Sequence, residues 1–218
     1  MREVRERIAA AATRVGRSPS AIKLVVVSKG RSDKAVREVY EAGQRDFGEN
    51  RAEELWSRAG KFPDDIRWHF VGKLQGRKVR RVRLMVVMLH SLDRVELANY
   101  WLEGPGRQPP AMLQVNVGRE PRKLGVLPEE AERVAEQVTA LGLDLRGLST
   151  LPPRGRRAED SRPWFQELAS LRARLATRWE RLTELSMGMS EDFEVAVEEG
   201  ATLLRVGRAI FEPVTEER

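Results

Sequence analysis

The chain of 218 residues contains no cysteine and only two histidines. The lack of cysteine excludes disulfides, thiolate catalysis, iron–sulfur clusters and zinc sites built from cysteine. His69 and His90 cannot form a three-histidine site, so we expect no metal centre. The longest uninterrupted apolar run, Leu84–Leu89, is far shorter than the roughly 20 residues that a membrane span needs. We therefore expect no membrane-spanning segment.

The first residues, Met1–Glu6, are mostly charged and lack the apolar region of a secretory signal peptide. With 41% apolar and 33% charged residues, the composition argues against wholesale disorder. No segment has the composition of a linker, and the one loose stretch, Pro152–Pro163, is predicted to be a mobile surface loop. We predict a cytoplasmic protein with a single domain over residues 1–218.

The net charge is +6, since 39 Lys and Arg face 33 Asp and Glu. A basic balance favours anionic partners such as nucleic acid, phosphate esters or a membrane surface. The acidic residues are interspersed as on an ordinary solvated surface, and the basic run Arg77–Arg83 has no interleaved aromatic residue for base stacking. We therefore interpret this run as a solvated helix face and do not favour nucleic-acid binding.

Short apolar runs alternate with amphipathic stretches along the chain. The runs are Ile22–Val27, Gln44–Phe47, Arg67–Val71, Leu84–Leu89, Met112–Val117, Leu143–Leu148, Glu184–Met187 and Thr202–Val206. Several are continuously apolar, which is typical of parallel strands covered on both faces. Eight such strands predict an α/β fold with a single (β/α)8 barrel of the TIM type and an extra N-terminal helix. An open doubly wound sheet is the alternative, but no Gly-x-Gly-x-x-Gly follows the first run.

Capping residues and apolar spacing mark the helices between these strands. Ser32 is predicted to cap a helix, and Pro128 suits the first turn of another. Apolar residues keep helical spacing from Phe165 to Leu182, which predicts one long helix. Ser190 is predicted to open a helix that carries acidic residues in its first turn.

Lys29 follows the apolar run Ile22–Val27 after one residue, Ser28, so the predicted fold places it at the carboxyl end of the first strand. In a barrel, this end of the strands carries the site. Two interpretations remain open. Either the lysine extends to solvent at the rim of the sheet, or it is partly buried and its neutral amine attacks a carbonyl to form a Schiff base.

The segment Ser186–Ser190 follows the seventh strand. Gly188 allows close approach of the backbone, and the hydroxyl groups of Ser186 and Ser190 lie beside a predicted helix N-terminus, an arrangement that suits a phosphate. Alternatively, Ser190 simply caps the helix and Gly188 makes the turn.

Arg205 lies among apolar residues on the predicted eighth strand and needs a partner there, because an unpaired buried charge is costly. Gly207 frees a backbone N–H for an anion, and Arg208 follows it. The loops after the seventh and eighth strands are a frequent phosphate site in barrels. Together with Lys29, these residues indicate an anionic ligand that carries a carbonyl group.

Other polar residues near strand ends carry weaker signals. Asn50 follows the second strand and either binds a ligand or caps the next helix. His69 is interpreted as a hydrogen-bonded residue of the core or rim rather than as an acid or base, and His90 is interpreted as structural.

Several segments, taken together and in order, resemble a known family. They are Val25–Lys29, Ala42–Asn50, Trp68–Gly72, Leu74–Gln75, His90–Arg94, Ser186–Ser190 and Arg205–Gly207. The combination resembles the YggS/PROSC family, the pyridoxal phosphate homeostasis proteins, over nearly the whole chain. The resemblance implies a single (β/α)8 barrel similar to the N-terminal domain of alanine racemases, with pyridoxal 5′-phosphate (PLP) as its cofactor.

The resemblance also implies roles for individual residues. Lys29 stands at the family's Schiff-base position, and Arg205 matches the arginine that faces the pyridine nitrogen. Ser186, Ser190 and Gly207 match the loops that contact the phosphate. An arginine at the ring nitrogen keeps that nitrogen unprotonated, so the ring is a weaker electron sink and suits binding better than broad catalysis.

Asn50, Gly188 and Arg208 complete the predicted cofactor site. Arg208 stands where the family commonly has a small hydroxyl residue, so one phosphate contact is expected to be lost or replaced by a charge pair. Glu212 also departs from the pattern, since a glycine is usual after Phe211. No departure removes the lysine or the arginine of the site.

The predicted function is reversible PLP binding that buffers or delivers the cofactor without catalytic turnover, with PLP-dependent apo-enzymes as candidate recipients. The alternative is a PLP-dependent amino-acid racemase. Racemases with this barrel have a second, β-rich domain that helps to supply a catalytic tyrosine. Here the only tyrosines, Tyr40 and Tyr100, lie on predicted helices, and little sequence follows the eighth strand. Two-sided proton transfer at Lys29 therefore lacks a second acid or base.

Overall fold

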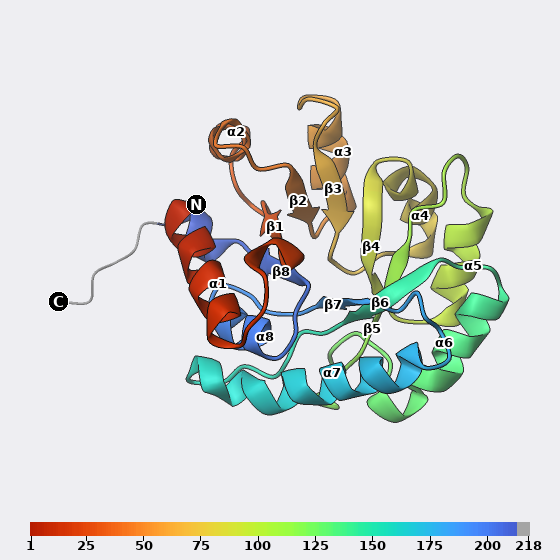
Figure 1. Ribbon diagram of the computed structural model, residues 1–218. Coiled ribbons are helices and arrows are strands. Elements are labelled where there is room, and N and C mark those ends of the chain that lie inside the picture. Colours follow the sequence, from red (N-terminus) through yellow and green to blue (C-terminus); the bar gives the residue numbers. More distant parts are fainter. Residues whose placement is uncertain (213–218) are drawn as a thin grey trace.

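The computed structural model describes residues 1–212. Eight parallel strands pair in chain order, and β8 closes the barrel by pairing with β1. The strands are β1 (Lys23–Val27), β2 (Asp46–Glu49), β3 (Arg67–Phe70), β4 (Val86–Leu92), β5 (Ala111–Gln114), β6 (Leu145–Ser149), β7 (Glu184–Ser186) and β8 (Leu203–Val206). Helices alternate with the strands and surround them (Figure 1). The prediction of a (β/α)8 barrel is confirmed.

The helices also follow the predicted alternation. They are α1 (Arg2–Arg14), α2 (Asp33–Glu41), α3 (Ala52–Ala59), α4 (Gly76–Arg83), α5 (Val95–Glu103), α6 (Ala131–Ala140), α7 (Arg162–Ala176), α8 (Phe193–Glu198) and α9 (Arg208–Phe211). Ser32 caps α2, because its hydroxyl accepts a hydrogen bond from the Ala35 N–H at 3.2 Å. Pro128 begins a short 3-10 helix that leads into α6. Both predicted helix starts are confirmed.

The observed strands overlap the predicted runs but differ from them at their ends. β2 reaches Glu49 rather than Phe47, and β6 reaches Ser149 rather than Leu148. β5 is shorter than predicted and ends at Gln114. β2 and β6 end in polar residues, Glu49 and Ser149, whose side chains are hydrogen-bonded inside the protein, and an apolar run cannot mark such residues.

The barrel has two apolar cores because each strand has two faces. The main core lies between strands and helices and includes Leu24 and Val26 of β1. Val25, which lies between them, belongs with Met112 and Leu203 to a second cluster. Since successive side chains of a strand point to opposite faces, this second cluster fills part of the barrel interior.

The predicted extra N-terminal helix, α1, is present and packs against α8 (Figure 1). Arg7 pairs with Glu194 at 2.9 Å, and Arg14 pairs with Glu198 at 2.8 Å. The apolar side of α1, including Ile8, is buried in the main core. α1 is therefore part of the helical layer around the barrel.

The predicted start of the helix at Ser190 is wrong. α8 begins at Phe193, and residues 189–192 form a turn instead. The Asp192 carboxylate accepts a hydrogen bond from the Met189 N–H at 2.7 Å and another from the Ser161 hydroxyl at 2.8 Å. The acidic residue expected inside the helix therefore closes the turn that precedes it.

The predicted long helix is also too long. α7 ends at Ala176, and the chain turns before Leu182. Leu182 is buried in the main core, so its spacing from the helix reflects burial of the following segment and not a continuous helix. α7 is the longest helix within residues 1–212, and none of the helices described has the length and apolar character needed to cross a bilayer.

The basic run on α4 does not form a solvated face throughout. Arg80 and Arg81 are exposed as predicted, but Arg83 is buried. Its guanidinium donates hydrogen bonds to the carbonyl oxygens of Leu102 at 3.2 Å and Arg107 at 3.1 Å. The Leu102 carbonyl is one of those that a helix leaves unpaired at its end, and Arg107 lies in the segment after α5. Arg83 therefore satisfies an acceptor of α5 and holds the segment that follows it.

Candidate functional site

A cavity of about 390 Å³ opens at the carboxyl ends of the strands. It is lined by Val27, Lys29, Arg31, Asn50, Val71, Leu151, Met189, Ser190, Arg205, Gly207, Arg208 and Glu212. The lining comes from the carboxyl ends of β1, β2, β3, β6, β7 and β8 or from the segments that follow them. This is the end of a TIM barrel that carries sites, and the volume suits a small molecule. Six of the eight residues predicted to bind a cofactor lie here.

Lys29 lies in the loop after β1 and lines the cavity together with Arg205 and Gly207. Its side chain is exposed rather than partly buried. The position at the solvent-facing rim therefore agrees with the structure, and the expected partial burial is wrong. Lys29 nevertheless lines the cavity, where a ligand could reach it.

A buried ion pair holds the loop that carries Lys29. The Ser28 hydroxyl donates to Glu49 Oε1 at 2.6 Å, and Arg58 of α3 pairs with the same carboxylate. Arg58 also donates to the Ser28 carbonyl oxygen at 3.0 Å and to the carbonyl oxygen of Arg31. These contacts fix the backbone on both sides of Lys29.

Glu49 is fully buried beneath this loop. Burial raises the pKa of Glu49, against the opposing effects of the Ser28 hydrogen bond and the Arg58 charge. The second carboxylate oxygen, Oε2, has no hydrogen-bond partner among residues 1–212. The brace of the lysine loop is therefore incomplete on one side.

Asn50 follows β2 and lines the cavity. It does not cap α3, whose N-cap residue is Arg51. Its side-chain oxygen Oδ1 is buried and has no hydrogen-bond partner within the described residues. Of the two predicted roles, ligand binding is the one that the geometry favours, because a buried acceptor is costly without a donor.

Arg205 is the buried cation of the site and is only 6% exposed. Its Nη1 donates to the Ser186 carbonyl oxygen at 2.6 Å and to the Ser186 hydroxyl, and its Nη2 donates to the Thr150 carbonyl oxygen at 2.6 Å. Burial lowers the pKa of Arg205 to about 10, so the guanidinium remains charged at neutral pH. Among the described contacts, Nε–H and one Nη2–H are left for an acceptor in the cavity.

The segments after β7 and β8 also line the cavity and contact each other. The Ser190 hydroxyl accepts a hydrogen bond from the Ala209 N–H at 3.1 Å, which joins the two segments. A Cβ atom on Gly207 would lie 2.9 Å from the Val27 carbonyl oxygen, so the close approach there requires glycine. Arg208 pairs with Glu191 at 2.8 Å, and its charge is therefore shared with an acidic residue at the surface.

Two residues predicted to contact a cofactor, Ser186 and Gly188, do not line the cavity. Ser186 is fully buried on β7, where its hydroxyl contacts Arg205 and His90. Gly188 has a φ of +89°, and a Cβ atom there would lie 2.5 Å from the Cβ of Ala196 in α8. Ser186 thus supports Arg205 from inside the barrel, and Gly188 allows α8 to pack closely.

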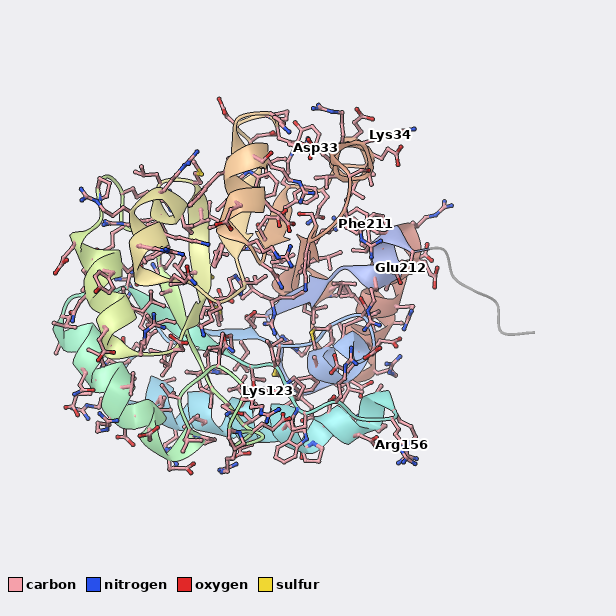
Figure 2. All side chains as sticks on the ribbon, turned by 180° about the vertical axis from the view of Figure 1, so that it is seen from behind. Asp33, Lys34, Lys123, Arg156, Phe211 and Glu212 are labelled. Atoms are coloured by element: carbon pink, nitrogen blue, oxygen red, sulfur yellow. The ribbon has the colours of Figure 1, made fainter. Side chains whose placement is uncertain are left out.

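Sequence reasoning assigned no role to Arg31. Its guanidinium pairs with Glu212 at 2.5 Å and lies over the Phe211 ring, 5.5 Å from the ring centre. Figure 2 shows Phe211 and Glu212 side by side where α9 ends. This ion pair lies at the cavity and joins segments 181 residues apart in the chain, so no local pattern could reveal it.

His69 and His90 are both buried and hydrogen-bonded to each other, with His69 Nδ1 and His90 Nε2 2.9 Å apart. Their interpretation as hydrogen-bonded core residues agrees with this arrangement. The sequence did not show that the two rings would meet, because they lie on different strands, β3 and β4.

Comparison with known proteins places the chain among close relatives. It matches the family model of the alanine racemase N-terminal domain over residues 1–213. It is 40% identical over 214 residues to the pyridoxal phosphate homeostasis protein of Aquifex aeolicus (strain VF5), which covers 95% of this chain and 94% of that protein. To the pyridoxal phosphate homeostasis protein of Escherichia coli (strain K12), it is 37% identical over 217 residues, with 96% and 93% covered.

A solved structure is similar over the whole fold. It is that of PipY from Synechococcus elongatus PCC7942 with PLP bound, which has a TM-score of 0.81 and 36% sequence identity. The similarity covers 95% of this chain and 99% of the PipY chain.

Proposed function

This chain belongs to the family of the pyridoxal phosphate homeostasis proteins and carries the alanine racemase N-terminal domain, and on that premise we propose that it binds PLP reversibly, and buffers or delivers it without catalytic turnover. One observation carries the proposal. A single cavity presents an exposed amine, a buried guanidinium and a glycine-containing turn, from Lys29, Arg205 and Gly207. These groups match an aldehyde, a pyridine nitrogen and a phosphate.

The groups that line the cavity fit PLP. Asn50 Oδ1 and two N–H groups of Arg205 lack partners within the described residues, and a ligand with polar groups would satisfy them. When bound, PLP supplies an aldehyde that condenses with an amine, with loss of water. Lys29 is the lysine that lines the cavity and would provide this amine. Ser190 and the backbone around Gly207 would hold the phosphate.

Arg205 determines the kind of chemistry that the site supports. A guanidinium has only donors, so Arg205 would hold an aromatic nitrogen as an unprotonated acceptor, and such a ring withdraws electrons weakly. Within residues 1–212, the carboxylate that lines the cavity is Glu212, which is paired with Arg31. Racemisation needs an acid or base opposite Lys29, so these residues support binding over turnover.

The first test is covalent labelling of the chain with PLP and borohydride. We expect the label on a peptide that contains Lys29, and we expect Lys29→Ala to abolish both the label and the yellow colour. Lys34→Ala is the matched control, because Lys34 lies nearby on α2 with an exposed side chain and outside the cavity (Figure 2). Label that persists in the Lys29→Ala protein, measured by peptide mass spectrometry, would contradict the proposal.

We further propose that residues 1–218 act as one PLP-binding domain in the cytoplasm and that PLP-dependent apo-enzymes receive the cofactor. The PLP-loaded protein is expected to restore activity to an apo-enzyme, with loss of its own absorbance at the same rate. Exchange of the α-hydrogen of an amino acid for solvent deuterium would instead favour the racemase, and its absence across a panel of amino acids would dismiss that alternative.

A further inference from the structure

A row of hydrogen-bonded side chains crosses the barrel interior from Asp46 to Arg205. Asp46 Oδ1 and His69 Nε2 are 3.1 Å apart, and His69 Nδ1 and His90 Nε2 are 2.9 Å apart. His90 Nδ1 lies 2.8 Å from Ser186 Oγ, which also contacts Arg205. All five residues are buried. We call Asp46, His69, His90 and Ser186 the interior relay.

Strand alternation explains why these side chains meet. His69 and Arg205 each lie between two residues of the main core on their strands, so their own side chains face the barrel interior. The relay draws on β2, β3, β4 and β7, and it ends on β8. Asp46 is the first residue of β2, whereas Arg205 lines the cavity at the other end. The relay therefore connects the amino end of the barrel with the floor of the site.

Arg205, which can only donate, and the Asp46 carboxylate, which can only accept, together set the direction of the hydrogen bonds in the relay. Arg205 can only donate, so Ser186 Oγ accepts from it and directs its own proton to His90 Nδ1. His90 then carries its proton on Nε2 and donates to His69 Nδ1. His69 likewise carries its proton on Nε2 and donates to Asp46. Both rings are neutral in this arrangement, and every ring nitrogen has a partner.

The opposite direction is less favourable. It would place the proton of His90 on Nδ1 and would require a charged His69 beside Asp46. The Ser186 hydroxyl would then receive two donors, and its own proton would have no acceptor in the relay, which is costly in a buried position. Burial also disfavours the charged form of each histidine, and it lowers the pKa of both.

Asp46 provides the negative end of the relay. Arg67 donates to its carboxylate from Nε at 2.9 Å and from Nη2 at 2.5 Å. Although burial alone would raise it, the pKa of Asp46 lies well below its usual range because of the hydrogen bonds from Arg67 and His69. The other charged groups that act on the two rings are Lys23 and Arg205, and both oppose protonation of the histidines.

We propose that Asp46, acting through His69, His90 and Ser186, holds Arg205 in a fixed orientation as hydrogen-bond donor to a ring nitrogen in the cavity. This inference rests on the proposed PLP binding. The Ser186 hydroxyl can accept from Arg205 because it donates its own proton to His90 Nδ1. His90 Nδ1 is free to accept because the ring proton of His90 lies on Nε2, and the acceptor at the end of the relay, the Asp46 carboxylate, favours this arrangement. The four relay residues are positioning residues and do not touch the ligand.

The direction of the relay can be measured in the ligand-free protein. The chain has only two histidines, so 15N-histidine labelling gives two sets of ring signals in long-range 1H–15N NMR spectra. We expect both rings to be neutral at pH 7 with the proton on Nε2. A proton on Nδ1 of His90, or a charged His69, would overturn the inference without any variant being made.

Removal of the carboxylate tests whether Asp46 sets the direction. In Asp46→Ala, we expect both histidines to shift their proton to Nδ1, although Asp46 makes no hydrogen bond to His90. Asp46→Asn keeps an oxygen that accepts from His69 and is expected to retain the wild-type protonation. Asp65→Ala is the matched control, since Asp65 pairs with Arg45 at 2.6 Å outside the relay.

PLP titration then tests the positioning role. We expect Asp46→Ala to bind PLP roughly three- to tenfold more weakly than the wild type, which corresponds to the loss of one oriented hydrogen bond at Arg205. The PLP affinities of Asp46→Asn and Asp65→Ala are expected to be near that of the wild type. Unchanged affinity in an Asp46→Ala protein whose histidine protons have shifted would overturn the proposal. If the wild-type protein does not bind PLP, the proposed function fails, and the histidine signals still determine the direction of the relay.

Discussion

Arg205 is a charged side chain in the barrel interior, and its neighbours explain how the fold tolerates it. The carbonyl oxygens of Ser186 and Thr150 accept its hydrogen bonds at 2.6 Å each. Among the described residues, no carboxylate forms an ion pair with it. Its hydrogen-bond partners are neutral oxygens, and the Asp192 charge acts on it without a direct contact. Apolar residues would fill such a position at lower cost in a purely structural core. A ligand that accepts from Arg205, as proposed above, would explain this cost.

Replacement of Arg205 by lysine is expected to abolish most of the PLP affinity. The lysine ammonium keeps the charge but lacks the planar fork that reaches both carbonyl groups, so we expect at least about tenfold weaker binding. Arg133→Lys is the matched control. Arg133 forms an exposed ion pair with Glu130 at 3.4 Å on the surface and does not line the cavity, so we expect its PLP affinity to match that of the wild type. Absorbance titration with PLP measures both, and equal losses would contradict the assignment.

Gly188 is expected to be intolerant of a side chain. Its φ of +89° and the 2.5 Å approach to Ala196 both oppose a Cβ atom, so Gly188→Ala should lower the free energy of unfolding by about 2–4 kcal/mol. Gly142→Ala separates the two causes, because Gly142 has a φ of +91° with no atom within 4 Å of the added Cβ. We expect it to cost only about 1 kcal/mol in urea unfolding. A similar cost in both proteins would show that packing at α8 is unimportant.

At the scale of elements, α3 controls the loop between β1 and α2. Arg58 of α3 contacts Glu49 at the end of β2 and the carbonyl groups on both sides of Lys29. α3 therefore joins two neighbouring strand ends of the barrel. As a consequence, the loop that carries Lys29 has a fixed backbone while the Lys29 side chain is exposed at the rim.

Removal of Arg58 tests this brace. Arg58→Met would leave Glu49 buried without its cation, and we expect the free energy of unfolding to fall by about 3 kcal/mol. Adding Glu49→Gln should recover part of this loss, since a neutral amide is less costly to bury than a carboxylate. A double-mutant cycle by urea denaturation measures the coupling. Additive effects of the two substitutions would show that the pair does not act as a unit.

At the scale of the whole molecule, the barrel interior is divided between an apolar and a polar part. Val25, Met112 and Leu203 form the apolar part, and the interior relay with Arg205 forms the polar part. A polar core is stable only when its members are hydrogen-bonded, and each relay residue has a partner on a neighbouring element. The fold therefore depends on the protonation state of its two histidines.

This dependence predicts weaker stability at mildly acidic pH. Burial lowers the pKa of His69 and His90 in the folded protein, whereas the unfolded chain binds protons with a pKa near 6.5. Below that pH the unfolded state binds more protons, so the free energy of unfolding rises with pH. Between pH 7 and 5.5, we expect a loss of about 1 to 2.5 kcal/mol in urea unfolding. Glu49, whose pKa is raised, acts in the opposite direction.

His90→Gln provides the comparison for this prediction. It removes one of the two titrating rings, so its stability should fall less steeply than that of the wild type over the same pH range. Stability that is flat or that increases toward pH 5.5 in the wild type would show that the histidines are not buried in neutral form.

The local signals in the sequence were sufficient for the strand–helix alternation and for most of the site. Lys29, Asn50 and Gly207 could be found because each lies shortly after an apolar run, and the carboxyl ends of parallel strands meet at one edge. The misplaced start of α8 shows where such reasoning stops. Asp192 looks like a first-turn residue, yet its contact with Ser161 from another segment draws it into a turn.

The amino-acid sequence by itself determined the barrel, the end of the barrel that carries the cavity, and the amine and guanidinium that line it, from Lys29 and Arg205. These follow from periodicity and from which residue comes after which strand. Only the tertiary structure decided that Ser186 supports Arg205, that His69 meets His90, and that Arg31 reaches Glu212. Each of these contacts depends on the register between strands or on chain ends far apart in sequence. Alternation along a strand assigns a side chain to a face but not to a partner.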